Sequence, residues 1–263
     1  MSIVERTALF LYEKTKSRPL ILHIDAIGFF KFGENKGQTI EDIINNKLEK
    51  FCEVLIKAEE LGANIIIPTF SYSITSGVKF DLLNTKSEVG SATEYIRKKF
   101  PDKRTYDPIF SYLVFSKKIS LQKDFEVKNF DSFGYNSLIE RVFNMDGSIG
   151  SIGDVLWRTT EAHYIEKKLG VNYRFDKEFK GIVIDKEAIE HFVTSIFFCR
   201  DLNLNLETNF KPIINDLRTD GLVEEWCINE FCIEVLSIKK LAAKMKKKYQ
   251  ENKLYFTKED NEN

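Results

Sequence analysis

The sequence predicts an α/β fold, specifically a layered α/β/α sandwich with a mixed, largely parallel central sheet. Strand-like and helix-like segments alternate along the chain, which favours helices packed on both faces of one sheet. A strand, a long helix and a second strand follow one another within residues 20–67, as in a parallel crossover unit. No internal repeat or Pro/Gly/Ser-rich linker divides the chain. We therefore expect residues 1–263 to form one domain that ends in a charged helix and tail at 243–263.

The first elements are predicted from apolar spacing and from capping residues. Residues 2–16 have helical spacing, with four apolar side chains on the expected buried side, Ile3, Val4, Leu9 and Leu11. Residues 20–23 are a short apolar run that predicts a buried strand. Thr39 is the expected N-cap of a long helix, and Gly62 is its expected stop. Residues 64–67 then form the second predicted strand.

The remaining elements follow from the same patterns. We expect helices at residues 91–99, 136–145, 154–169 and 207–219, and strands at residues 112–115, 180–184 and 192–199. The glycine-rich stretch at 147–153 is interpreted as a turn and a strand, because no lysine follows it and it does not match GxGxxG. After Ala242, the run of lysines predicts a solvated basic helix with a frayed acidic end.

Composition excludes several classes of partner. The chain carries 39 basic and 40 acidic side chains, a net charge of -1, so it lacks the positive field that attracts nucleic acid. No apolar run approaches the ~20 residues of a membrane span, and the N-terminus lacks a secretory cleavage pattern. The four cysteines are scattered, without a CxxC pair: Cys52, Cys199, Cys227 and Cys232. We expect a cytoplasmic protein with reduced thiols and no nucleic-acid or membrane partner.

The three histidines are the first candidates for proton transfer, because the ordinary pKa of histidine lies near neutral pH. Thr160, His163 and Glu166 are spaced three apart, so they would share one face of the predicted helix. A carboxylate one turn from an imidazole fixes its tautomer and raises its basicity, as a general base requires. The pair has two interpretations: a base with its orienting carboxylate, or an ordinary helix-surface pair.

The other two histidines have no carboxylate partner that the sequence spacing predicts as clearly. His23 ends the first predicted strand, two residues before Asp25, at the strand edge where α/β proteins place ligand groups. His191 begins a Phe-rich strand and is interpreted as structural. No HExxH motif or Cys/His cluster predicts a metal site, and no GxSxG motif predicts a hydrolase nucleophile. Cys227 and Cys232 are interpreted as core thiols.

In chain order these segments resemble the aminoglycoside 3-N-acetyltransferase family, from about residue 18 to 242. The matching segments are 22–25 (LHID) at the first-strand His-Ser motif, 67–72 (IPTFSY) at the Pro-Thr-Phe signature, 80–97 at the FD…SxxG…ExxR run, 104–111 (RTYDPIFS) at the Arg-Ser-x-His-Pro-x-x-Ser motif, 133–137 at FGxxS and 160–166 (TEAHYIE) at TxxHxxE. Each motif alone is weak, but six in order and at compatible spacing indicate homology.

The resemblance implies an enzyme that binds acetyl-CoA together with a small-molecule amine, which attacks the thioester directly. By this resemblance His163 is the catalytic base and Glu166 orients it. The residues implied to contact the acceptor are Glu94, Asp107 and Asp25. The residues implied to contact coenzyme A are His23, Ala26, Gly28, Ser71, Arg104 and Ser111, with backbone N–H groups of the Ala26–Gly28 turn receiving the oxyanion. Arg104 would hold a CoA phosphate or brace Asp107.

Two departures from the family pattern bear on the acceptor. Ile24 replaces the usual serine, and Asp107 replaces the histidine that commonly precedes the proline in drug-modifying members. We therefore expect an amino sugar other than an aminoglycoside antibiotic as the preferred acceptor. The alternatives are an acyltransferase for another acceptor in surface-glycan biosynthesis, a catalytically silent CoA-binding homologue and a Cys-dependent acyl carrier. A monomer and a homodimer are both compatible with the sequence.

Overall fold

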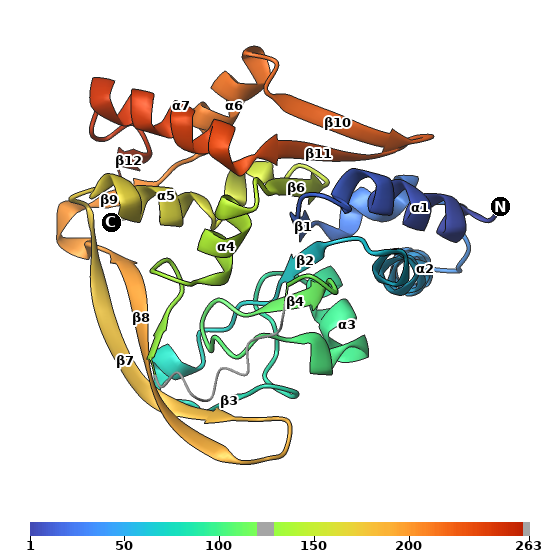
Figure 1. Cartoon of the computed structure of the whole chain (residues 1–263), viewed down its shortest axis with the longest axis horizontal. Helices are drawn as coiled ribbons and strands as arrows, with labels where there is room; N and C mark the ends of the chain where they lie inside the picture. The colour runs from blue at the N-terminus through green and yellow to red at the C-terminus, as the bar shows by residue number, and fades with distance from the viewer. Residues whose placement is uncertain (120–128, 260–263) are drawn as a thin grey trace.

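A six-stranded mixed sheet forms the centre of the protein, whose computed structural model describes residues 1–119 and 129–259 (Figure 1). Its strand order is β10-β11-β6-β1-β2-β4. These strands span β1 (Leu20–Ile24), β2 (Ile65–Pro68), β4 (Tyr112–Phe115), β6 (Ser148–Ile152), β10 (Val223–Ile228) and β11 (Phe231–Ser237). β1 pairs in parallel with both β2 and β6, whereas β4, β11 and β10 join antiparallel. The predicted fold class is confirmed, with the parallel part confined to the three central strands.

Helices cover both faces of this sheet. They are α1 (Ile3–Thr15), α2 (Ile40–Leu61), α3 (Ser91–Lys99), α4 (Leu138–Asn144), α5 (Ala162–Leu169), α6 (Lys211–Thr219) and α7 (Ile238–Glu251). α1, α2 and α3 contribute to one hydrophobic core, and α4 to α7 contribute to the other. Alternate residues of β1 divide between the cores, because successive side chains of a strand point to opposite faces: Ile21 joins one and Leu22 the other. This is the predicted sandwich.

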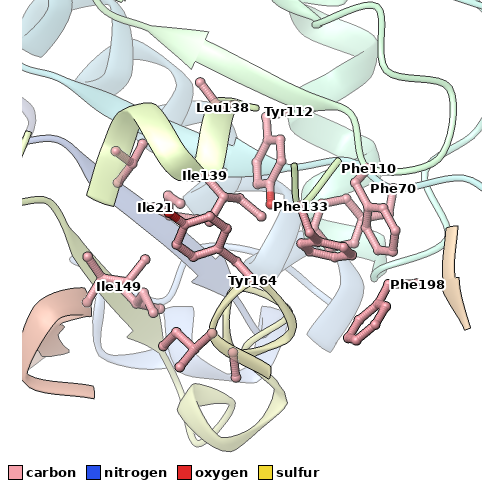
Figure 2. Packing of buried hydrophobic residues seen from close by; sticks show 14 of the residues in the cluster. Ile21, Phe70, Phe110, Tyr112, Phe133, Leu138, Ile139, Ile149, Tyr164 and Phe198 are labelled. Carbon is pink, nitrogen blue, oxygen red and sulfur yellow. The ribbon is translucent and has the colours of Figure 1, made fainter. Parts of the chain in front are cut away.

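A second sheet flanks the sandwich, in the order β3-β7-β8-β5. Its strands are β3 (Phe80–Asp81), β5 (Asn129–Asp131), β7 (Arg174–Ile184) and β8 (Glu190–Arg200), and a small third sheet pairs β9 (Leu206–Thr208) with β12 (Thr257–Glu259). β7 and β8 form the long curved hairpin drawn in yellow and orange in Figure 1. Phe197 of β8 joins the second sheet to the core through ring contacts with Tyr72 and Phe110. Figure 2 shows Phe70, Phe110 and Phe133 beside Tyr112 in that core.

Capping residues set the helix boundaries that the sequence predicted. Thr39 and Asp42 exchange backbone and side-chain hydrogen bonds in a capping box at the start of α2. Gly62 ends that helix with φ 105°, a left-handed conformation that favours glycine. Ser2 and Glu5 form a second capping box at α1.

Two long predicted helices are shorter than expected. The segment 154–169 contains a 3₁₀ turn, η5 (Leu156–Arg158), and becomes α-helical only at Ala162. Between the two, Thr159 is extended, and the side chain of Glu161 is fully buried. The segment 207–219 likewise begins in β9, and its helix starts after Phe210.

Other expectations are corrected at the edges of the fold. The hairpin β10–β11 was not predicted, because β10 is an edge strand that contains two adjacent exposed glutamates and no buried residue. Leu9 is exposed rather than buried. The C-terminal basic helix is amphipathic and packs against the core through Ile238, Leu241, Met245 and Tyr249, with its lysines on the other face. Within the described residues, no helix is long and apolar enough to cross a membrane.

Candidate active site

The carboxyl ends of β1, β2 and β6 meet at one edge of the sheet, because these three strands are parallel. A pocket of about 570 Å³ opens there, next to the N-terminus of α3. Three residues that the sequence predicted as site residues line it: His23, Asp25 and Ala26. Phe70, Arg158 and Thr160 are among the other lining residues. Gly28 lies on an adjoining groove that shares Asp154 with this pocket.

His163 and Glu166 form the pair that their spacing predicted. Nδ1 of His163 lies 2.6 Å from Oε2 of Glu166 on the first turn of α5. The imidazole packs between the rings of Phe133 and Phe210, and its side chain keeps 18% of its surface exposed. Thr160 lines the pocket at the strand ends and accepts a hydrogen bond from the backbone N–H of His163, which is not itself among the lining residues. The bond to Nδ1 leaves Nε2 as the nitrogen that can accept a proton.

Three protein groups surround the carboxylate of Glu166. Besides His163, the hydroxyl of Tyr173 donates at 2.8 Å and Nε of Arg174 lies 3.0 Å away. Although burial raises it, the hydrogen bond and charge of His163, together with Arg174, hold the pKa of Glu166 below its usual value. Burial lowers the pKa of His163, and the charge of Arg174 acts in the same direction against the opposing effect of Glu166. The imidazole is therefore neutral at neutral pH, as a proton acceptor must be.

A second histidine–carboxylate pair was not predicted. Nε2 of His23 lies 2.8 Å from Oε2 of Glu161, whose side chain has no exposed surface. Thr159 donates to the same carboxylate at 2.6 Å, and the hydroxyl of Tyr112 donates to its other oxygen at 3.2 Å. Although burial raises it, the charge and hydrogen bond of His23 hold the pKa of Glu161 below its usual value. The pair thus joins β1, β4 and the segment that leads into α5.

The turn after β1 is organised by Asp25. Its side chain accepts a hydrogen bond from the backbone N–H of Ile27 at 3.1 Å, and its carbonyl accepts one from the N–H of Gly28 at 3.0 Å. Two of the three amides expected to receive an oxyanion therefore already have acceptors, and only that of Ala26 remains. Asp25 acts here as the N-cap of the 3₁₀ turn η1 (Ala26–Lys31).

Arg104, Ser111 and Ser71 are buried in the interior, which differs from the expected contact with coenzyme A. The guanidinium of Arg104 donates to Ser111 at 2.9 Å and to the carbonyls of Thr85 and Thr69 at 2.5 and 2.6 Å. Burial, with the nearby charge of Arg97, lowers the pKa of Arg104 to about 9. Arg104 therefore joins loops around β2 and β4 through Ser111, Thr85 and Thr69, and not through Asp107.

Glu94 and Asp107 also have internal partners. Both carboxylate oxygens of Glu94 pair with Arg97, at 2.7 and 2.9 Å, and the N–H of Ser87 donates to one of them. Asp107 accepts from the N–H groups of residues 109 and 110 at 3.0 Å each, and from the Ser132 hydroxyl at 2.5 Å. Asp107 lines a separate cavity of about 250 Å³ beside β5. Neither carboxylate lines the pocket at the strand ends.

No cysteine has the character of a nucleophile. Cys227 and Cys232 form a disulfide across the β10–β11 hairpin, which corrects the expectation that all thiols are reduced core residues. Burial raises the pKa of the Cys52 thiol to about 12, and it also raises the pKa of Cys199. Neither residue lines the strand-end pocket. Among the residues that the structure covers, no cluster of His, Cys, Asp and Glu side chains is arranged to hold a metal ion.

His191 has an acidic partner that the sequence analysis did not identify. Its Nε2 lies 2.8 Å from Oδ2 of Asp185, at the turn of the β7–β8 hairpin. Asp185 also accepts from backbone N–H groups of that turn. The pair stabilises the hairpin end, as expected for a structural histidine.

Comparison with known proteins identifies one family. The family model described as aminoglycoside 3-N-acetyltransferase matches residues 49–250. No curated protein sequence matches the chain.

Solved structures share the fold. AAC-IIIb, in a binary complex with CoASH, is 12% identical with a TM-score of 0.63, over 93% of this chain and 95% of that one. AAC-VIa bound to sisomicin is 14% identical with a TM-score of 0.64, over 94% and 96%. The YokD protein from Bacillus subtilis is 12% identical with a TM-score of 0.61, over 95% and 94%. At these identities the likeness concerns the fold alone.

Proposed function

Because the chain belongs to the aminoglycoside 3-N-acetyltransferase family and is an acyltransferase, we propose that it transfers an acetyl group from acetyl-CoA to the amine of an amino sugar. Acetyl-CoA is the co-substrate that the family uses, and CoASH is bound in the structurally similar AAC-IIIb. The structurally similar AAC-VIa binds sisomicin, an aminoglycoside, whereas the acceptor proposed for this chain is a smaller amino sugar.

The observation that carries this proposal is the 2.6 Å contact between His163 and Glu166. In this direct transfer the amine nitrogen attacks the thioester carbonyl carbon, and Nε2 of His163 takes a proton from that nitrogen. Glu166 holds Nδ1–H and so fixes the tautomer that presents a free Nε2. When the C–S bond breaks, its electron pair goes to sulfur, and the proton held by His163 is available to the thiolate.

The state of the four cysteines favours direct transfer over a mechanism with an acyl-enzyme intermediate. A cysteine nucleophile needs a lowered pKa and an exposed thiol. Burial raises the pKa of both Cys52 and Cys199, and the other two cysteines share a disulfide.

A thiol-release assay with acetyl-CoA tests the proposal. Amino sugars, their nucleotide-linked forms and aminoglycosides are offered in turn, and at least one should release CoA with formation of an amide. His163→Ala should lower kcat by about 10²–10⁴, the usual contribution of a general base, while the affinity for CoA stays the same.

His191→Ala is the matched control, because His191 also pairs with a carboxylate but lies at the far end of the β7–β8 hairpin. It should keep the wild-type rate. Saturable CoA binding without turnover on any amine would identify a silent homologue. An ester product would identify a hydroxyl acceptor. Either result contradicts the proposal.

A further inference from the structure

Two of the histidine–carboxylate pairs, His163–Glu166 and His23–Glu161, differ in which side chains balance the charge of the carboxylate. Glu166 has a permanent cation beside it, Arg174, at 3.0 Å, in addition to His163. Glu161 is equally buried, but in the described part of the chain His23 is the one basic side chain that pairs with it. Its other two partners, Thr159 and Tyr112, are neutral donors.

This difference separates the charges of the two imidazoles. An ionised carboxylate without solvent is stable only beside a cation. Arg174 provides that charge for Glu166, so His163 can remain neutral. For Glu161, His23 is the one basic side chain among the described residues in a position to provide it. The two pairs are chemically similar, but their surroundings suit them to opposite roles. His163 can accept a proton, whereas His23 can donate a hydrogen bond.

The position of His23 suits a donor to the substrate. It is the last-but-one residue of β1 and lines the pocket at the carboxyl ends of the parallel strands. Its Nε2 is bound to Glu161, and within the described residues no protein group bonds to its Nδ1. A doubly protonated ring therefore has one N–H that remains available for a bound molecule.

The reaction needs such a donor. Acyl transfer places negative charge on the thioester oxygen in the tetrahedral intermediate, and donors aimed at that oxygen stabilise the transition state. In the turn after β1, the amides of Ile27 and Gly28 already bond to Asp25, so they are not available. The main chain of that turn leaves only the amide of Ala26.

We propose that His23, as an imidazolium paired with Glu161, donates its Nδ1–H to the acyl oxygen of acetyl-CoA. This inference rests on the proposed acetyl transfer. When the amine attacks the carbonyl carbon, the π electrons of the carbonyl move to oxygen, and His23 stabilises that charge. When the carbonyl re-forms, the C–S bond breaks and the pair leaves on sulfur. His23 keeps its proton throughout, and His163 handles the proton of the amine.

Two isosteric substitutions separate this role from a structural one. The amide nitrogen of asparagine occupies roughly the place of Nδ1, whereas that of glutamine occupies roughly the place of Nε2. His23→Asn therefore keeps a donor toward the acyl oxygen and loses the bond to Glu161. His23→Gln keeps the bond to Glu161 and loses the donor. A residue that only anchors Glu161 would tolerate Gln better than Asn.

We expect His23→Gln to lower kcat by about 10²–10³, the cost of removing one oxyanion donor, with little change in KM for acetyl-CoA. His23→Asn should retain a kcat at least about tenfold above that of His23→Gln, since it keeps the donor toward the acyl oxygen that His23→Gln lacks. Glu161→Gln should lower kcat as His23→Gln does, and the double variant should be no slower than either single one.

The outcomes distinguish this inference from the proposed function. Wild-type protein that acetylates no amine overturns both. An active wild type with an inactive His163→Ala and a fully active His23→Gln overturns the role of His23 alone. The same follows if Asn is worse than Gln, or if His23→Gln and Glu161→Gln act additively. Thermal unfolding and CoA binding of each variant serve as controls for folding.

Discussion

The pKa of the base, His163, is lowered first by burial and then by the charge of Arg174, which takes no part in the acyl-transfer chemistry. Arg174 contacts Glu166 at 3.0 Å, and its charge also acts directly on His163. With burial acting in the same direction, the pKa of His163 lies below its ordinary value. The lowered pKa keeps the ring unprotonated, and therefore able to accept a proton, over a wider pH range. It also makes the ring a weaker base.

This predicts the acid limb of activity. A base works only when unprotonated, so kcat should fall as pH drops through the pKa of His163 in the complex. That limb should lie below about 6.5, the ordinary value for histidine. Measuring kcat rather than kcat/KM separates this limb from the ionisation of the free amine. An acid limb at or above the ordinary histidine value would contradict the assignment.

Arg104 gives a second prediction at this scale, on stability. Arg104→Met removes the donors to Thr69 and Thr85 and leaves buried carbonyls without partners, at about 1–3 kcal/mol each. We expect the free energy of unfolding to fall by about 3 kcal/mol or more, with an unchanged KM for acetyl-CoA where the variant is folded. Arg18→Met, at an exposed arginine, is the matched control. A raised KM without loss of stability would instead restore Arg104 as a CoA ligand.

Single residues were predictable only where their partners are close in sequence. His163 and Glu166 are three positions apart, so helical spacing alone predicts their contact. Glu161 and His23 are 138 positions apart, and only the folded sheet brings them together. Arg104 and Glu94 fall in recognisable motifs, but a motif does not show whether a charged side chain faces a ligand or the interior.

At the scale of elements, the turn η1 has to lie very close to the end of β6. A Cβ added at Gly28 would lie 2.6 Å from the backbone nitrogen of Gly153 and 2.8 Å from the carbonyl carbon of Ile152. Because these are backbone atoms, a side chain can be accommodated only if the turn moves away from the strand. The turn carries Ala26 and follows His23, so its displacement would alter the pocket.

We therefore expect Gly28→Ala to destabilise the protein by about 1–3 kcal/mol, the usual cost of overpacking, and to raise KM for acetyl-CoA. Gly77→Ala is the control, because a Cβ there meets nothing within 4 Å and only the left-handed backbone, φ 74°, opposes it. Chemical denaturation and steady-state kinetics measure the two effects. Wild-type kinetics in Gly28→Ala would show that the turn does not shape the site.

Elements with local signals were predicted well, and those without them were not. Capping residues and glycine stops gave the limits of α2, and the crossover pattern gave the pairing of β1 with β2. The hairpin β10–β11 joins the sheet only through antiparallel contacts with β6, a partner more than 70 residues earlier. The sequence of an edge strand contains little that specifies such a partner.

For the whole molecule, the family assignment made from six ordered motifs is confirmed, and with it the fold class and the enzyme class. A fold or family does not by itself fix the substrate, so membership alone does not name the acceptor. The net charge of the chain bears on which acceptor is attracted, and at -1 it is nearly balanced. A balanced surface gives a polycation little long-range attraction.

The acceptor is the subject of the last prediction. We expect weak or no activity on aminoglycoside antibiotics and better activity on a smaller amino sugar. Glu94 and Asp107, the carboxylates expected to hold ammonium groups, are fully engaged by Arg97, Ser132 and backbone amides. The carboxylates that do line the strand-end pocket, such as Asp25 and Glu88, share it with the cation Arg158.

A polycation that makes only exposed ion pairs gains about 0–1 kcal/mol from each, so several ammonium groups would add little affinity here. A small amino sugar needs only one or two well-placed partners near the thioester. Steady-state kinetics on kanamycin-type and gentamicin-type drugs, against amino sugars and their nucleotide-linked forms, measure the difference. A kcat/KM of about 10⁴ M⁻¹s⁻¹ or more on the drugs, the range of an efficient enzyme, would contradict the prediction and identify a resistance enzyme.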